Sequence, residues 1–176
     1  MTSPAFKRCL ALPVELAARG FTLRGETLDD VPFLERLYVS VRWEELAPVA
    51  WPEEAKVAFL QSQFALQYRH YAVHYAESDF GILEHQGVPA GRLYLFRGRR
   101  DVRIVDVSLL PEWRNGGIGS ALLGALFEEA AAEGRSVSIH VEKFNPAQRL
   151  YHRLGFREIS EDGVYRLMEW KAEAAA

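Results

Sequence analysis

The chain has 176 residues, a length typical of a single globular domain. It carries 21 basic and 24 acidic residues, and the formal charge of −3 excludes binding driven mainly by nucleic-acid phosphates, which requires clustered positive charge. Hydrophobic residues make up 49% of the chain, enough for a folded core, while no apolar run approaches the roughly 18 residues that a membrane span needs.

We expect three segments: an N-terminal arm over residues 1–19, one domain over residues 20–171 and a flexible tail over residues 172–176. The arm contains the only cysteine of the sequence, Cys9, which has no partner for an internal disulfide. A reducing compartment, the cytoplasm, is therefore the expected location.

The first half of the domain predicts strands and helices in alternation. Helical spacing of apolar residues predicts a helix over 28–41 and one long or two short helices over 53–75. Between them, segment 43–52 contains two tryptophans and two prolines, and loops with such large apolar side chains often line pockets. Short apolar runs bounded by turn residues predict strands over 21–24, 80–83 and 92–96.

The second half predicts a strand–helix–strand unit followed by a hairpin. Because a helix separates the two strands of the unit, they should run parallel and be joined by a right-handed crossover. The fold class is therefore mixed α/β, with antiparallel strands flanking one parallel pair. The expected elements are a strand over 102–110, a helix over 117–133, a strand over 136–141, a short helix between Asn145 and Gly155, and hairpin strands over 156–159 and 164–170.

The most informative stretch is the glycine-rich turn of residues 114–120, between the strand and the helix of this unit. Its glycines allow several backbone N–H groups to point toward one spot, at the positive end of the helix dipole, which favours an anion such as phosphate. The plain alternative is a tight turn that brings the helix close to the strand.

Two familiar phosphate motifs do not match this turn. A Walker loop is excluded because no Gly-Lys-Ser or Gly-Lys-Thr occurs. A dinucleotide fingerprint lacks its third small residue, since Leu122 stands there, although Glu142 follows at the distance of a ribose-binding acid. An NAD-type enzyme therefore stays as an alternative hypothesis.

Taken with the segment that follows it, the turn resembles the GNAT superfamily of acyl-CoA-dependent N-acyltransferases. The Arg/Gln-x-x-Gly-x-Gly/Ala pattern of that family is met by Arg114, Gly117 and Gly119. Its second signature is matched by residues 145–147 and 150–156 at the expected separation. The resemblance implies a three-layer fold, in which helices cover both faces of a mostly antiparallel sheet with one parallel, splayed strand pair.

The resemblance also implies that the cofactor is acetyl-CoA, with its diphosphate on the backbone of the glycine-rich turn. The end of the preceding strand would pair with the pantetheine arm, and the N–H of Leu109 would donate to the acetyl carbonyl. Asn145 is placed beside the arm on the same basis, although an Asn before Pro is also a sufficient helix cap. The expected cofactor-binding residues are Leu109, Leu110, Arg114, Asn115, Gly116, Gly117, Ile118, Gly119, Ser120 and Asn145.

Three residues are candidates for proton transfer. Tyr151 resembles the general acid of the family, and its ordinary pKa of about 10 keeps it protonated; a packed core tyrosine is the alternative. His140 is the first candidate base, since its ordinary pKa of about 6.5 suits the task, although a hydrogen-bonded core histidine explains it equally. Asp106 is the rival base, and an ion pair would explain it as well.

The expected reaction is direct acetyl transfer to a primary amine, either a small molecule or a peptide, in a ternary complex. A non-catalytic acyl-CoA sensor is the alternative, and no metal, nucleic acid or membrane is expected as a partner. A homodimer is compatible with the sequence. His70 and His74 are expected to border the acceptor pocket, whose walls are predicted to include Tyr38, Trp43, Glu44, Trp51 and Tyr71.

Overall fold

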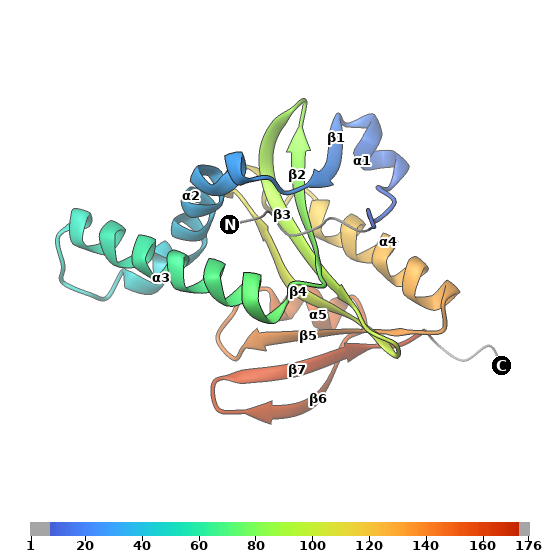
Figure 1. The fold of residues 1–176 in the computed structure, drawn as a ribbon. Coiled ribbons are helices and arrows are strands. Elements are labelled where there is room, and N and C mark those ends of the chain that lie inside the picture. The colour runs from blue at the N-terminus through green and yellow to red at the C-terminus, as the bar shows by residue number, and fades with distance from the viewer. Residues whose placement is uncertain (1–7, 173–176) are drawn as a thin grey trace.

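The computed structural model describes residues 8–172, which form a seven-stranded sheet with helices on both faces (Figure 1). Residues 1–7 of the expected arm and 173–176 of the expected tail lie outside the described residues. The strand order is β1-β2-β3-β4-β5-β7-β6, and only β4 and β5 are parallel neighbours. The expected fold class is therefore confirmed. The strands are β1 (Phe21–Gly25), β2 (Asp79–His85), β3 (Val88–Arg97), β4 (Asp101–Leu109), β5 (Ser136–Glu142), β6 (Arg157–Asp162) and β7 (Tyr165–Trp170).

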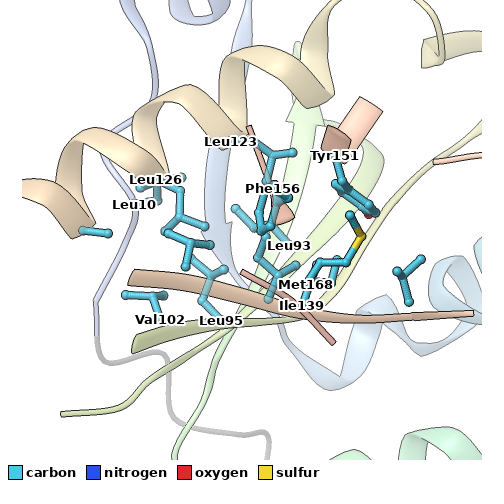
Figure 2. Close-up of a cluster of buried hydrophobic side chains, with 14 residues drawn as sticks. Leu10, Leu93, Leu95, Val102, Leu123, Leu126, Ile139, Tyr151, Phe156 and Met168 are labelled. Atoms are coloured by element: carbon cyan, nitrogen blue, oxygen red, sulfur yellow. The ribbon is translucent and has the colours of Figure 1, made fainter. Parts of the chain in front are cut away.

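The helices form the outer layers. Leu37 of α2 and Phe64 of α3 share a buried cluster with Tyr94 of β3, so these two helices cover one face of the sheet. Leu123 and Leu126 of α4 pack on the opposite face, as Figure 2 shows. None of the helices within residues 8–172 has the length and apolar character needed to cross a membrane. The helices are α1 (Val14–Ala18), α2 (Val31–Arg42), α3 (Glu53–His74), α4 (Ile118–Ala132) and α5 (Gln148–Arg153).

The structure decides between the two helical alternatives for residues 53–75 and adds one helix that was not expected. Segment 53–75 forms one continuous helix of 22 residues, α3. The expected N-terminal arm contains a short helix, α1, which the sequence analysis did not predict. Its five residues are too few to be stable alone, and the helix is held by Leu16, which is fully buried against the domain.

The parallel strands β4 and β5 pair over only part of their length. The pairing begins at Asp101 with Ser136 and ends at Ile104 with Ile139, although β4 continues to Leu109 and β5 to Glu142. We call the space between the unpaired portions the β4–β5 split. It agrees with the splayed strand pair that the family resemblance implies.

A β-bulge in β4 accompanies the split. The register between β3 and β4 shifts at Tyr94 and Leu95, which pair with Asp106 and Ile104, so Val105 is the extra residue. Bulges bend a strand and increase its twist, which carries β4 away from β5. The bulge also switches the faces of β4: Ile104 packs in the cluster of α4, whereas Asp106 bonds to Tyr71 of α3.

Candidate functional site

The turn before α4 presents uncapped backbone amides. Asn115 and Gly117 adopt the left-handed conformation, with φ of +60° and +78°, and the helix begins immediately afterwards at Ile118. The first backbone bond into the helix joins the N–H of Ala121 to the carbonyl of Gly117 at 3.0 Å. The preceding N–H groups of residues 118–120 therefore have no place in the helix ladder, and among the described residues no side chain caps them.

The glycines of the turn leave the space before the helix open. A Cβ at Gly117 would meet nothing within 4 Å, and a Cβ at Gly119 would make only an ordinary contact with Leu150 at 3.5 Å. Gly117 is needed for its backbone conformation, which L side chains rarely adopt. Together with the uncapped amides, this open space can accept an anion.

The end of β4 supplies a backbone donor to the split. The N–H of Leu110 donates to the carbonyl of Ala90 on β3 at 2.9 Å. Because hydrogen-bonding directions alternate along a strand, the N–H of Leu109 points away from β3, toward the split. Arg114 fixes this strand end, since its Nε donates to the carbonyl of Leu109 at 2.9 Å.

Close packing of β3 against β4 holds the same strand end in place. Gly91 of β3 pairs with Leu109, and a Cβ there would lie 2.5 Å from the Ser108 carbonyl oxygen. Only glycine therefore allows this approach without a shift of the backbone.

Tyr151 of α5 lies at the edge of the core under α4 and points toward the sheet (Figure 2). Its ring packs edge-on against Phe156, with the ring centroids 5.6 Å apart. Burial and the negative charge of Asp106 both raise the pKa of the Tyr151 hydroxyl, so this group remains protonated at neutral pH. The hydroxyl can therefore act as a proton donor but not as a base.

Asn145 caps the turn that precedes α5. Its Oδ1 accepts a hydrogen bond from the N–H of Ala147 at 2.9 Å, and the helix begins only at Gln148, later than the sequence predicts. The capping role is thus present in the structure. The side chain is exposed, which leaves its amide N–H groups accessible.

His140 is an exposed residue of β5. It directly follows Ile139, the last residue of β5 that pairs with β4, and alternation along the strand places it on the face opposite α4. Partial burial of the ring, and secondarily the positive charge of Arg103, lower the pKa of the imidazole below its ordinary value. At neutral pH the ring is therefore mostly neutral and can accept a proton.

Asp106 is engaged in a network of side chains. Its carboxylate accepts hydrogen bonds from Arg92 at 2.6 Å, from Tyr71 at 3.1 Å and from the Ser108 hydroxyl at 2.6 Å. Arg92 is buried and also donates to Gln67 of α3 at 2.9 Å. The network joins β3, β4 and α3, and it gives Asp106 the ion pair that the sequence analysis considered as an alternative to catalysis.

Tyr38, Trp43 and Tyr71 belong to one apolar cluster between α2, α3 and the sheet, whereas Glu44 and Trp51 are exposed. Tyr71 reaches Asp106, but Tyr38 is a core residue packed on Phe64, with ring centroids 5.9 Å apart. Trp43 is half-buried at the edge of the same core, Glu44 is exposed, and Trp51 is exposed against Phe59 of α3.

A cavity of about 430 Å³ lies between the end of α3 and the beginning of β4. It is at the end of β4 remote from Leu109, where β4 and β5 are still paired. His70 and His74 therefore border this cavity and not the split, and their rings stack at 4.2 Å. No group of three potential metal ligands occurs within residues 8–172. The residues lining the cavity are His70, His74, Tyr75, Phe96, Asp101 and Arg103.

Sequence reasoning missed two arginines near the split. Arg92 holds Asp106, and Arg42 at the end of α2 reaches Glu142 at the end of β5, at 2.9 Å. Arg92 could have been found, because a charged residue inside an apolar strand requires a buried partner. Nothing in the sequence around Arg42 indicates its contact, which depends on how α2 packs on the sheet.

The chain matches a known protein family. The sequence model of the acetyltransferase (GNAT) family matches residues 34–156. No curated protein matches the chain in sequence.

Solved structures show the same fold at low sequence identity. A PaiA N-acetyltransferase from Thermoplasma acidophilum, in complex with coenzyme A, is similar with a TM-score of 0.64 and 18% identity, over 86% of this chain and 99% of that chain. YncA from Salmonella typhimurium, with acetyl-CoA, has a TM-score of 0.52 and 22% identity, and the match covers 89% of this chain and 97% of that chain. The ribosomal-protein-S18-alanine N-acetyltransferase from Escherichia coli has a TM-score of 0.58 and 19% identity, and the match covers 89% of this chain and 96% of that chain.

Proposed function

The chain belongs to the acetyltransferase (GNAT) family, and on this premise we propose that it transfers an acetyl group from acetyl-CoA to a primary amine by direct attack in a ternary complex. The observation that carries the proposal is the position of the uncapped start of α4, directly beyond the strand end that faces the β4–β5 split. Here a phosphate site and a strand-like site for an extended arm adjoin each other.

The residues present fit acetyl-CoA. The N–H groups of residues 118–120 are suited to the diphosphate, and a Cβ at Gly117 would meet no atom within 4 Å. The unpaired edge of β4 is suited to the amide groups of the pantetheine arm, as in the addition of a strand to a sheet. When bound, acetyl-CoA supplies the thioester that the amine attacks.

The backbone of β4 would stabilise the charge that develops on the acetyl oxygen. The N–H of Leu109 faces the split, and the hydrogen bond from Arg114 to the Leu109 carbonyl holds this peptide group in place. A fixed N–H dipole contributes because it needs no reorganisation during the reaction.

Tyr151 and His140 would handle the two protons. The Tyr151 hydroxyl is kept protonated by burial and by Asp106, which suits donation to the departing thiolate. The His140 ring is kept neutral, which suits acceptance of the amine proton, directly or through water. We favour His140 over Asp106 as the base, because the Asp106 carboxylate already accepts three hydrogen bonds.

The amine would approach from the face of α2 and α3, opposite α4. His140 lies on this face, and the network of Asp106 places the hydroxyls of Ser108 and Tyr71 there. Of the residues predicted to contact the amine, Tyr71 is the best supported, because its hydroxyl bonds to Asp106 on this face. Trp51 is the least supported, because it packs on Phe59.

Calorimetric titration with acetyl-CoA, followed by a thiol-release assay across alkylamines, polyamines, amino acids and peptides, tests the proposal. We expect saturable binding and release of coenzyme A with at least one class of amine. Absence of binding at about millimolar acetyl-CoA, on the order of the weakest specific affinity, would overturn it. Binding without thiol release from any amine would instead favour the acyl-CoA sensor.

A further inference from the structure

The short helix α1 packs beside the start of α4 (Figure 1). Leu16 of α1 is fully buried and belongs to the same apolar cluster as Ile118 and Leu122 in the first two turns of α4. α1 precedes residues 34–156, the segment that matches the family. Its placement is therefore a feature of this chain that the two motifs do not predict.

This packing brings Arg19, the residue after α1, to the glycine-rich turn. Nη1 of Arg19 donates to the carbonyl of Gly116 at 3.1 Å. The guanidinium lies over the ring of Phe21, 5.4 Å from its centroid, and Phe21 packs edge-on against Trp113 at 5.3 Å. One donor of Arg19 is thus fixed on the turn, and the exposed side chain has further N–H groups to offer.

Among the residues that the structure describes, no acidic side chain balances the charge of Arg19. Within residues 8–172 no ion pair is found for Arg19, whereas Arg24 and Arg97 each contact two carboxylates. Arg114, on the same turn, also forms no ion pair there and uses its guanidinium on the Leu109 carbonyl. Two cations without an ion pair among the described residues therefore adjoin the positive end of α4, an arrangement that attracts an anion.

We propose that Arg19 binds a phosphate group of acetyl-CoA, which makes α1 part of the cofactor site. The inference rests on the proposed function, because it takes acetyl-CoA as the ligand of the turn. A planar guanidinium suits phosphate oxygens, and tethering by Gly116 and Phe21 reduces the conformational freedom that binding would otherwise cost. A role limited to holding the turn would need one neutral donor and no charge.

The test compares wild type, Arg19→Gln and a control, Arg157→Gln. Arg157 is also exposed but lies on β6, at the opposite edge of the sheet from β1. We expect Arg19→Gln to raise the Kd of coenzyme A about tenfold, the loss of one charge-assisted hydrogen bond, and Arg157→Gln to leave it unchanged. Binding should also depend less on salt in Arg19→Gln than in wild type, which loss of a purely structural contact would not cause.

Coenzyme A and its 3′-dephospho form identify which phosphate is bound. A similar loss with both ligands assigns the contact to the diphosphate, while a loss only with coenzyme A assigns it to the ribose 3′-phosphate. Equal affinity of Arg19→Gln and wild type for coenzyme A overturns the inference alone. Failure of wild type to bind overturns the proposed function as well. An NMR resonance of the Arg19 Nε–H that does not shift on addition of coenzyme A to wild type would also contradict the contact.

Discussion

The two faces of the β4–β5 split are built from different parts of the chain. On the α4 face the proposed binding groups belong to the backbone, namely the uncapped amides of residues 118–120 and the N–H of Leu109. On the face of α2 and α3 the polar groups are side chains that bond to one another, Arg92, Asp106 and Tyr71. A backbone site depends on glycine conformation and register, whereas a side-chain site depends on individual charges. The two faces should therefore respond differently to substitution.

The largest effect on turnover is expected for Tyr151→Phe, which removes only the hydroxyl. Loss of a positioned proton donor should lower kcat about a thousandfold. The Kd of acetyl-CoA should stay near the wild-type value, because the backbone groups proposed to bind it are unchanged and the packing on Phe156 is kept. Steady-state kinetics and calorimetry measure the two quantities.

Tyr165→Phe is the matched control for this prediction, since Tyr165 is an exposed residue of β7. Its turnover should equal that of wild type. Wild-type kcat in Tyr151→Phe would remove Tyr151 from the role of general acid.

Asp106→Asn, on the face of α2 and α3, should lower the stability of the protein. It leaves the buried guanidinium of Arg92 without its counter-charge, and the expected loss in the free energy of unfolding is about 3 kcal/mol. Glu142→Gln makes the same chemical change in a half-exposed pair with Arg42, where less than about 1 kcal/mol is expected. Urea unfolding of both variants measures the difference, and equal losses would refute the distinction.

His140 should set the acid limb of the pH profile. An amine base must be neutral, so kcat/KM should fall as the pH drops through the His140 pKa, which burial places below the ordinary value of about 6.5. In His140→Gln this limb should disappear and kcat/KM at neutral pH should fall about a hundredfold. A limb retained in the variant would assign the base elsewhere, and Asp106 would be the next candidate.

The smallest effect concerns two glycines of the same helix region. Gly117→Ala should cost about 1 kcal/mol of stability, since alanine is strained at a φ of +78°. It should also weaken acetyl-CoA binding by placing a methyl group before the helix. Gly124 lies in the middle of α4, and a Cβ added there would meet no neighbouring atom within 4 Å. Gly124→Ala should therefore stabilise the protein by about 0.5 to 1 kcal/mol. Thermal unfolding measures both variants, and a stability change of the same sign in Gly117→Ala and Gly124→Ala would contradict this explanation.

The α4 face was predictable from sequence because its requirements are local. A position that needs the left-handed backbone conformation directly before a helix favours glycine, and Gly117 occupies that position. The strand, turn and helix around it follow from patterns within about 30 residues, as is typical of a strand–helix–strand unit.

The side-chain face was harder to predict because its contacts depend on long-range register. Strict alternation along β4 would place Asp106 on the same face as Ile104, and the bulge at Val105 reverses this. Its partner Arg92 comes from another strand, and Tyr71 from a helix 35 residues earlier. α1 was missed for a related reason, since burial of Leu16 and not local propensity stabilises it.

The central claim, that backbone amides at the start of α4 bind the diphosphate of acetyl-CoA, can be tested by amide chemical shifts during a titration with coenzyme A. The account predicts that the largest changes occur at Ile118, Gly119 and Ser120, with a second group at Leu109. Changes confined to another surface, such as the cavity beside His70 and His74, would contradict it, as would unchanged amides at saturation.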